Sequence, residues 1–370
     1  MMVRNAQQQA WKPQQSKAVN LLDRQSILSS LPGVLLPWYA EHHRELPWRE
    51  TTDPYRIWLL EIMLQQTRVE AVKGYYQRFL DALPTVNDLA RCPDDTLLKL
   101  WEGLGYYSRA RNLKKAAQVI VQQYGGTFPR DYASVLALPG IGEYTAGAVC
   151  SIAFDLPTPA VDGNVLRLVS RLTDDPAPID FPQTKAAVRQ ALSQVYPEKA
   201  GDFTQALMEL GATLCGPNQK PDCPACPCAH MCLGKLRGTA EALPVKSPKR
   251  QKRQEDKTVF IFSCDGRYAL EKRPGEGLLA GLWQFPNVPG HLSTQQCLEQ
   301  AQALGLRPRE LRREVSRKHI FTHIVWDMKG IFMEVSECSG DFLWFTKEQI
   351  NDQAALPTAF RLFWEDVHHV

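Results

Sequence analysis

Two acidic residues stand in sequence settings that suit them for proton transfer and for stabilising charge. Glu61 lies between Trp58 and Leu64 at helical spacing, so its carboxyl falls on an apolar stripe. Burial there raises the pKa of a carboxyl group, and a protonated acid can donate a proton near neutral pH. Asp162 stands just before the apolar-periodic segment that starts at Val165, where a helix N-cap belongs and where the helix terminus favours an ionised carboxylate. We therefore expect Glu61 to be a protonated acid and Asp162 to be an ionised carboxylate.

Both acidic residues also have ordinary structural explanations. A glutamate on an apolar stripe is often one partner of a buried ion pair, and an aspartate before a helix is often only its cap. Motifs this short recur by chance, so neither residue identifies a function by itself.

A glycine-rich turn precedes Asp162 and has to position it. We expect helices over residues 131–136 and 143–154. Gly140 and Gly142 between them require a tight hairpin whose glycines can adopt positive φ. Backbone N–H groups at the start of the second helix are free of side-chain bulk there, so they can point at a phosphate oxygen.

The hairpin and the aspartate together resemble a known family. LPGIG at residues 138–142, followed by VDGN at 161–164, is similar to the helix-hairpin-helix superfamily of DNA glycosylases. In that superfamily the hairpin, here Gly140 and Gly142, grips the DNA backbone, and the aspartate faces the scissile sugar. EIMLQQT at residues 61–67 resembles the MutY branch, the adenine DNA glycosylases. The resemblance implies removal of adenine mispaired with 8-oxoguanine or guanine in double-stranded DNA.

The resemblance also implies a role for each acidic residue. Breaking an N-glycosidic bond builds positive charge on the sugar and negative charge on the departing base, and two carboxyl groups in unlike settings answer both needs. Glu61 would donate a proton to adenine N7, and Asp162 would stabilise the sugar cation or trap it covalently before water attacks. By family position, Tyr144 and Asn164 would support Asp162 and the sugar.

Four further residues match family positions that contact DNA or the base. Adenine inside a duplex must be flipped out of the base stack before an enzyme can reach it. Gln66 and Tyr106 match the positions that fill or prise open the gap. Trp48 and Arg49 would line the adenine pocket.

Tyr144 separates two branches of the superfamily. In bifunctional relatives such as endonuclease III, a lysine two residues beyond the second hairpin glycine attacks the sugar as a Schiff-base nucleophile, and the strand is then nicked. Tyr144 takes that place here. We therefore expect base removal without a lyase step. The nearest alternative is an endonuclease III-like pyrimidine glycosylase and lyase. A further alternative is a protein that binds DNA damage without catalysis, which the presence of both acidic residues opposes.

Five of the ten cysteines fall between residues 215 and 232, which favours a metal site over disulfides. Zinc accepts four thiolates, but the spacing Cys-x7-Cys-x2-Cys-x5-Cys resembles the [4Fe-4S] loop of the superfamily, whose first gap is one residue shorter. Either the loop bulges around residues 216–218 or Cys228 replaces one ligand. We favour the bulge, because the last three cysteines keep the family register. The expected ligands of this structural cluster are Cys215, Cys223, Cys226 and Cys232.

The last third of the chain predicts a small α+β domain. Runs typical of strands lie at residues 258–263, 268–270, 320–328 and 330–335, and residues 294–304 are typical of a helix.

GLWQFP at residues 281–286 resembles the Nudix fold, the MutT-like domain of MutY proteins. Glu299 matches the first acid of the Nudix metal-binding box, but Gln302 and Ala303 replace its two adjacent acids. This loss opposes a Nudix-type nucleotide hydrolase, the alternative from another class. The domain would instead recognise the lesion, and the matching loop that touches 8-oxoguanine is Phe321, Thr322 and His323.

The distribution of apolar residues argues against a membrane-spanning or secreted protein. The 370-residue chain is 44% hydrophobic with a net charge of +3 at pH 7. It contains no apolar run near the roughly 20 residues of a membrane span and no signal-peptide core. We expect a soluble monomer without membrane contact, cytoplasmic and associated with a bacterial nucleoid, with a nuclear or mitochondrial location as the alternative.

The expected fold is multidomain: an all-α helix-hairpin-helix glycosylase core with an iron–sulfur cluster loop, followed by a C-terminal α+β Nudix-like domain. The expected segments are a disordered tail at residues 1–26, a helical glycosylase domain at 27–232 with the helix-hairpin-helix at 131–154 and the cluster loop at 215–232, a basic linker at 233–257, and a Nudix-like lesion-recognition domain at 258–370.

Overall fold

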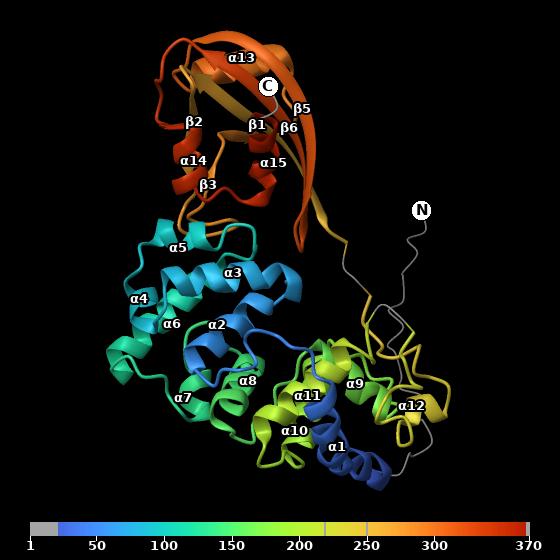
Figure 1. Ribbon diagram of the computed structural model, residues 1–370. Helices are drawn as coiled ribbons and strands as arrows, with labels where there is room; N and C mark the ends of the chain where they lie inside the picture. Colours follow the sequence, from blue (N-terminus) through green and yellow to red (C-terminus); the bar gives the residue numbers. More distant parts are fainter. Residues whose placement is uncertain (1–20, 218–219, 249–250, 368–370) are drawn as a thin grey trace, which may run out of the picture. The chain divides into compact units, whose positions relative to one another are not determined.

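The chain folds into two compact units, each assembled from two separate stretches of sequence. The computed structural model describes residues 21–217, 220–248 and 251–367 (Figure 1). The first unit combines the chain up to Thr52 with Gly142–Ser247, and the second combines Asp53–Ile141 with Pro248–Val370. The helical region expected at residues 27–232 therefore contributes to both units.

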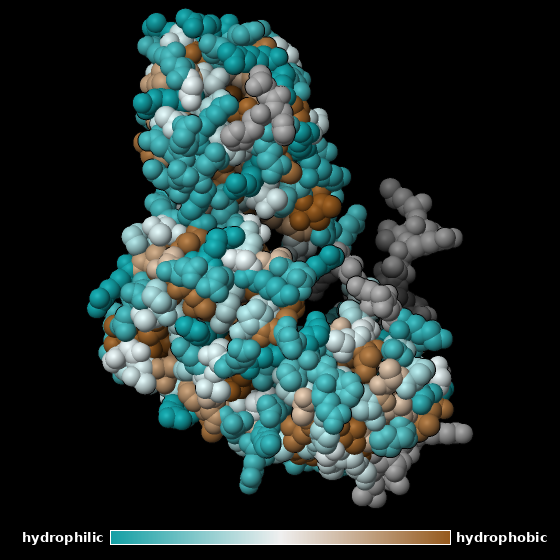
Figure 2. Space-filling view, viewed as in Figure 1, coloured by the Kyte–Doolittle hydropathy of each residue, from teal (hydrophilic) through white to brown (hydrophobic). Residues whose placement is uncertain are grey.

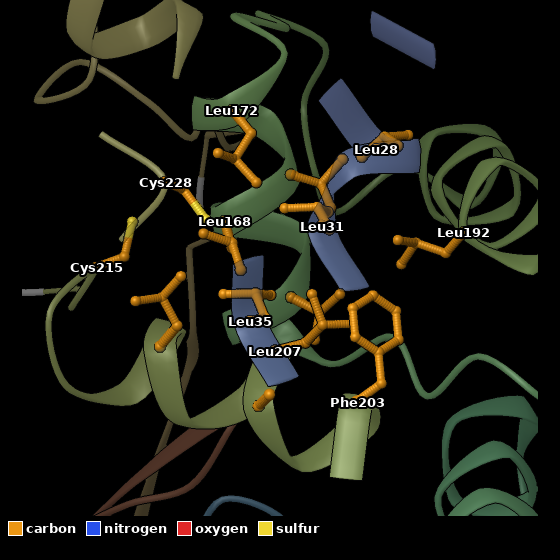
Figure 3. Packing of buried hydrophobic residues seen from close by; sticks show 14 of the residues in the cluster. Leu28, Leu31, Leu35, Leu168, Leu172, Leu192, Phe203, Leu207, Cys215 and Cys228 are labelled. Carbon is orange, nitrogen blue, oxygen red and sulfur yellow. The ribbon is translucent and has the colours of Figure 1, made fainter. Parts of the chain in front are cut away.

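The described part of the first unit is built from helices. They are α1 (Leu21–His42), α8 (Glu143–Phe154), α9 (Gly163–Leu172), α10 (Pro182–Ser193), α11 (Ala200–Ala212) and α12 (Leu233–Leu236). Apolar side chains of α1, α9 and α11, including Leu31, Leu168 and Leu207, pack into one buried cluster (Figure 3). The predicted tail ends at residue 26, but α1 already begins at Leu21, because no residue between them breaks a helix. Residues 1–20 lie outside the described part.

The first stretch of the second unit is also helical. Its helices are α2 (Pro54–Leu64), α3 (Val69–Ala82), α4 (Val86–Arg91), α5 (Asp94–Leu100), α6 (Ser108–Tyr124) and α7 (Tyr132–Leu136). Asp53 caps α2 by accepting hydrogen bonds from the N–H groups of Tyr55 and Arg56, and Pro54 takes the first helical position. This predicted cap fixes where the helix that carries Glu61 begins.

A mixed sheet and three helices form the second stretch of this unit. The elements are β1 (Arg253–Cys264), β2 (Arg267–Lys272), β3 (Trp283–Gln284), β4 (Asn287–Pro289), α13 (Thr294–Ala303), β5 (Pro308–Ile320), β6 (Ile324–Val335), β7 (Leu343–Thr346), α14 (Lys347–Gln353) and α15 (Thr358–Val367). The strand order is β3-β2-β1-β6-β5, with β1 parallel to β6 and β5 antiparallel to β6. One buried cluster contains Trp326 and Trp364 and another contains Phe262 and Ile331. The expected α+β architecture is confirmed.

Two strand predictions differ from the structure for physical reasons. β5 was missed before residue 320, because it is rich in charged residues and lies at the edge of the sheet, where few of its side chains need to be apolar. The runs predicted at 320–328 and 330–335 join into the single strand β6. Gly330 lies inside this strand because Phe363 packs over it: a Cβ there would lie 2.4 Å from Cε1 of Phe363.

The segment expected as a basic linker, residues 233–257, is divided among ordered elements. α12 opens it, and the residues up to Ser247 belong to the first unit. There Arg171 Nε donates to the carbonyl of Leu243 at 2.9 Å, and the N–H of Ile179 donates to the carbonyl of Val245 at 3.0 Å. Arg253 onward forms β1, and residues 249–250 lie outside the described part.

Hydrophobic residues are scattered over the visible surface of each unit. On the face in Figure 2 they lie singly or in small groups among hydrophilic residues. Within the described ranges, no helix has the length and apolar character needed to cross a membrane.

Candidate active site and cysteine loop

Asp162 is the N-cap of α9, as the sequence predicts. Its Oδ1 accepts a hydrogen bond from the N–H of Val165 at 2.8 Å, and its Oδ2 accepts one from the side-chain amide of Asn164 at 2.7 Å. Burial raises the pKa of Asp162, and these hydrogen bonds together with the charge of Arg167 oppose that rise. The sequence-based expectation considered only the helix terminus, so it underestimated burial, which is the larger effect.

Asn164 links Asp162 to the cysteine loop through Arg167. Nη2 of Arg167 donates to Oδ1 of Asn164 at 2.9 Å, and its Nε donates to the carbonyl of Cys215 at 2.7 Å. Gly211 allows this close packing, because a Cβ there would lie 2.7 Å from Cβ of Asn164. No sequence motif predicted a role for Arg167. Its helical spacing of three residues from Asn164 was the available signal.

A cavity of about 390 Å³ borders Asp162 within the first unit. Its lining residues are Asp162, Gly163, Asn164, Arg167, Arg171, Ile179, Pro217, Glu241, Leu243, Pro244 and Lys246. Three of these side chains are cationic and two are acidic, so positive and negative charges nearly balance along the cavity wall.

Arg49 is held by a buried glutamate that the sequence analysis missed. Glu209 on α11 is 1% exposed and pairs with Nε of Arg44 at 2.7 Å and Nη2 of Arg49 at 2.5 Å. Burial would raise the pKa of Glu209, but the hydrogen bonds from both arginines outweigh it and lower the pKa to about 2. Trp48, next to Arg49 in the chain, is also buried. A carboxyl group among apolar neighbours in the sequence was the signal for Glu209, as it was for Glu61.

Glu61 belongs to the second unit, near the C-terminal end of α2. Its side chain is 5% exposed, and its helix neighbours Trp58, Leu60 and Met63 are buried as well. The predicted apolar stripe is therefore present. Ionising a carboxyl group in such surroundings is costly unless it is paired or hydrogen-bonded.

Gln66 and Tyr106 share a strained backbone conformation. Their φ angles are 60° and 45°, in the left-handed region that favours glycine. Both residues are exposed, and the hydroxyl of Tyr106 lies 2.8 Å from Oγ1 of Thr322. The structure thus brings together Tyr106, which was predicted to enter the base stack, and Thr322, which was predicted to contact 8-oxoguanine.

Phe321, Thr322 and His323 form the turn between β5 and β6. Nζ of Lys252 donates to the carbonyl of Phe321 at 2.7 Å, and the N–H of Arg253 donates to the carbonyl of His323 at 2.9 Å. The Phe321 ring packs edge-on against Trp326 with 4.8 Å between ring centroids. The turn is therefore anchored at both ends while Thr322 and His323 stay exposed.

The helix that matches the Nudix box is α13. Glu299 is its only acidic residue, and it accepts a hydrogen bond from Gln295 at 2.9 Å. Gln302 and Ala303 follow in the last turn. One carboxylate on this helix supplies fewer oxygen ligands than a magnesium site of the Nudix type requires.

The hairpin between α7 and α8 confirms one predicted glycine conformation and corrects another. Gly140 has φ +76°, and a Cβ there would lie 2.5 Å from Cβ of Asn112. Gly142 is instead the N-cap of α8 with φ −98°, because a cap residue takes an extended conformation open to any residue type. Tyr144 lies in the first turn of α8 and is partly buried.

The four cysteines expected as ligands line one small cavity in the first unit. Cys215, Cys223, Cys226 and Cys232 all border a space of about 20 Å³, together with Arg171 and Lys235. Cys228 does not line this space, although it belongs to the same hydrophobic cluster as Cys215 and Cys232 (Figure 3). Among the described residues, no group of three or more His, Cys, Asp or Glu side chains is already arranged to hold a metal ion.

The one-residue-longer first gap lies in a loop that is closed at its base. The N–H of Asp222 donates to the carbonyl of Leu214 at 2.9 Å, and Nη1 of Arg171 donates to the carbonyl of Gly216 at 3.2 Å. Asn218, where the predicted bulge ends, lies outside the described residues.

Comparisons with known proteins support both halves of the chain. Residues 59–198 match the HhH-GPD superfamily of base excision DNA repair proteins, and residues 258–366 match the NUDIX domain. The adenine DNA glycosylase of Homo sapiens is 33% identical over 408 residues, covering 91% of this chain and 74% of the human protein.

Two solved structures resemble the helical part. A thermostable thymine-DNA glycosylase is 29% identical with a TM-score of 0.52, covering 59% of this chain and 99% of that one. A trapped endonuclease III–DNA covalent intermediate is 26% identical with a TM-score of 0.50, covering 58% of this chain and 98% of that one. The match to the human protein covers 91% of this chain and therefore extends into the NUDIX domain, whereas the two solved structures match 59% and 58% of the chain. The chain therefore belongs to the adenine DNA glycosylases, MutY-type enzymes with a helix-hairpin-helix core and a C-terminal Nudix-like domain.

Proposed function

We propose that this enzyme hydrolyses the N-glycosidic bond of adenine mispaired with 8-oxoguanine or guanine in duplex DNA and leaves the strand intact. The observation that carries the proposal is the setting of Asp162, a helix N-cap that accepts a hydrogen bond from Asn164 and borders a cavity of about 390 Å³. A carboxylate held in this way can face a sugar that gains positive charge as its base departs.

Glu61 acts as the acid in this proposal. It donates its proton to adenine N7, so the electron pair of the C1′–N9 bond leaves with a neutral base. Asp162 then stabilises the positive sugar, either as an ion pair or by a covalent bond to C1′. Water adds to C1′ and gives its proton to Glu61, which restores both carboxyl groups.

Residues around the everted base divide between a pocket and a wedge. Arg49, fixed by its ion pair with Glu209, and the buried Trp48 would contact the adenine. Gln66 and Tyr106 are exposed and would enter the base stack. The hairpin residues Gly140 and Gly142 would bind the DNA backbone through their N–H groups. The exposure of Gln66 and Tyr106 and the ion pair that holds Arg49 support these roles.

Strand cleavage is not part of the proposed reaction. A lyase step needs an amine that forms a Schiff base with the opened sugar. Tyr144 offers a phenol at the position where lyase relatives carry lysine.

Lesion recognition is assigned to the turn of Phe321, Thr322 and His323. The turn is anchored by Lys252 and Arg253 and presents Thr322 beside Tyr106. A hydroxyl there can exchange hydrogen bonds with the edge of an oxidised purine.

Cys215, Cys223, Cys226 and Cys232 would hold a [4Fe-4S] cluster. The four thiols share one cavity, and Arg171 and Lys235 beside them can balance thiolate charge. The cluster would serve as a structural cross-link, and it has no part in the proposed proton transfers.

Four substrates test the proposed function. The purified protein is incubated with duplexes that hold adenine opposite 8-oxoguanine, adenine opposite guanine, or thymine glycol, and separately with 8-oxo-dGTP. Free base, strand nicks and nucleoside monophosphate are then measured. The proposal expects free adenine from the first two duplexes and no borohydride-trapped adduct. Nicks on thymine glycol would favour the endonuclease III-like alternative, and monophosphate would favour a Nudix hydrolase.

A further inference from the structure

Arg109 is a buried cation for which the reaction above gives no role. It lies in the first turn of α6 and is 9% exposed. Its Nη1 donates to the carbonyls of Ile62, Met63 and Gln65 at 2.6, 3.2 and 2.7 Å. Its Nη2 donates to the carbonyls of Leu104 and Gly105 at 2.9 and 3.1 Å. One side chain therefore joins two segments that lie about 40 residues apart in the sequence.

The first three acceptors are carbonyls at the C-terminal end of α2. Such carbonyls have no partner within their own helix, and a cation at this end also meets the negative pole of the helix dipole. Arg109 thus acts as a side-chain cap for the helix that carries Glu61. Its guanidinium also lies 5.2 Å from the ring centroid of Trp101, which further compensates the cost of burying a charge.

Two of the carbonyls bound by Arg109 belong to the residues that immediately precede the strained residues. Gln65 immediately precedes Gln66, and Gly105 immediately precedes Tyr106. A left-handed backbone conformation at a non-glycine residue persists only where the surrounding structure enforces it. The hydrogen bonds from Arg109 provide this restraint next to both Gln66 and Tyr106. The guanidinium lies 5.8 Å from the ring centroid of Tyr106 as well.

We propose that Arg109 is a positioning residue that fixes Glu61, Gln66 and Tyr106 as one rigid group, so that a base everted by the wedge arrives at the acid. This inference rests on the proposed function, which assigns those three residues their roles. Arg109 itself contacts neither DNA nor base in this account. It acts through the backbone of its neighbours.

Arginine suits this position better than lysine. A planar guanidinium offers donors in a fixed fork, and here the two terminal nitrogens reach opposite segments. Burial lowers the pKa of Arg109 to about 10, so the group still carries its charge at neutral pH. An ammonium group can replace the charge but cannot satisfy both segments at once.

The test compares Arg109→Met and Arg109→Lys with a control on the same helix. Lys115 is exposed on α6, so Lys115→Met removes a cation without touching either segment. Thermal unfolding curves of all variants first identify a temperature at which each protein is folded. Hydrogen exchange is then measured for residues 62–67 and 103–107, together with single-turnover adenine release and duplex affinity.

We expect Arg109→Met to exchange faster in both segments at once. Its adenine release should fall about 100-fold, the cost of a displaced reacting group, while duplex affinity changes by less than about threefold. Arg109→Lys should recover part of the rate, and Lys115→Met should match the parent protein. With Tyr106→Ala already present, adding Arg109→Met should cost less than it does alone, because the two changes act through the same loop.

The inference fails if Arg109→Met leaves both segments protected and adenine release within about threefold of the parent protein. It also fails if the costs of Arg109→Met and Tyr106→Ala are simply additive, because independent destabilisation then explains both. Failure of the proposed function gives a different result: the parent protein releases no adenine, or Glu61→Gln retains its rate. In that case, faster hydrogen exchange in both segments of Arg109→Met still supports Arg109 as the residue that holds them together. Faster exchange in only one segment, or in neither, refutes this role.

Discussion

The side-chain amide of Asn164 donates to Oδ2 of Asp162 at 2.7 Å, while its own oxygen accepts from Arg167 at 2.9 Å. A single asparagine therefore holds the candidate anion on one side and a buried cation on the other. This relay opposes the rise that burial causes in the pKa of Asp162.

Removing the Asn164 amide should shift the pH dependence of adenine release. In Asn164→Ala, Asp162 loses a donor that favours its ionised form, so its pKa should rise further. Activity that depends on the anion is present above that pKa and is lost as pH falls through it. The acidic limb of the single-turnover rate should therefore move to higher pH. At neutral pH the rate should fall about tenfold, as for one hydrogen bond to a charged group.

The pH profile separates this role from simple destabilisation. A variant that is only less stable would lose rate at every pH and keep the midpoint of its acidic limb. An unmoved limb in Asn164→Ala would show that the amide does not influence the ionisation of Asp162.

Glu209 should contribute stability that depends on pH in a defined direction. Its pKa is about 2 in the folded protein, against about 4.5 when unfolded, so its contribution is fully present above about 4.5 and is lost as pH falls toward about 2. Glu209→Gln leaves Arg44 and Arg49 without their anion, which should cost about 3 kcal/mol near neutral pH. Urea unfolding at several pH values measures the difference between the two proteins. It should shrink on acidification below about 4.5, and a difference that stays constant to pH 3 would contradict the ion-pair explanation.

The two cysteines nearest each other in the loop should behave differently. Cys226→Ala should abolish the broad visible absorbance of an iron–sulfur protein, because Cys226 lines the shared cavity. Cys228→Ala should retain it, because Cys228 is the one cysteine of the loop that does not line that cavity. Absorbance spectra and iron content of the freshly purified proteins test this. Loss of iron from Cys228→Ala with retention in Cys226→Ala would reverse the assignment of the ligand.

Thr322 should matter most for the oxidised partner base. Thr322→Val preserves the shape of the side chain but removes the hydroxyl that lies beside Tyr106. Single-turnover adenine release opposite 8-oxoguanine should fall about tenfold, as expected for one lost hydrogen bond, with a smaller change opposite guanine. Ser316→Ala, an exposed hydroxyl on β5, is the control. An equal loss on both duplexes would assign Thr322 to general DNA binding instead.

Local sequence signals predicted the elements that carry the chemistry. The caps at Asp53 and Asp162 follow from residue type and position alone, since a side chain caps the helix next to it. Cysteine spacing was also informative, because the four cysteines chosen by the family register line one cavity that Cys228 does not border. Such signals act over a few residues, where sequence distance and spatial distance agree.

Contacts over long sequence distances could not be predicted in the same way. Arg49 and Glu209 are 160 residues apart, and Tyr106 and Thr322 are 216 residues apart. Only the packing of whole helices and strands brings these pairs together. Burial of Asp162 was underestimated for the same reason, because its N-cap position is a local property and its burial is a property of the fold.

The most direct measurement is single-turnover adenine release by Glu61→Gln and Asp162→Asn, with duplex affinity measured in parallel. Each change preserves shape and removes one chemical role, so each should lower the rate about a thousandfold or more while affinity stays within about threefold. If either variant kept most of the parent rate on adenine opposite 8-oxoguanine, the assignment of that carboxyl group to the reaction would be contradicted.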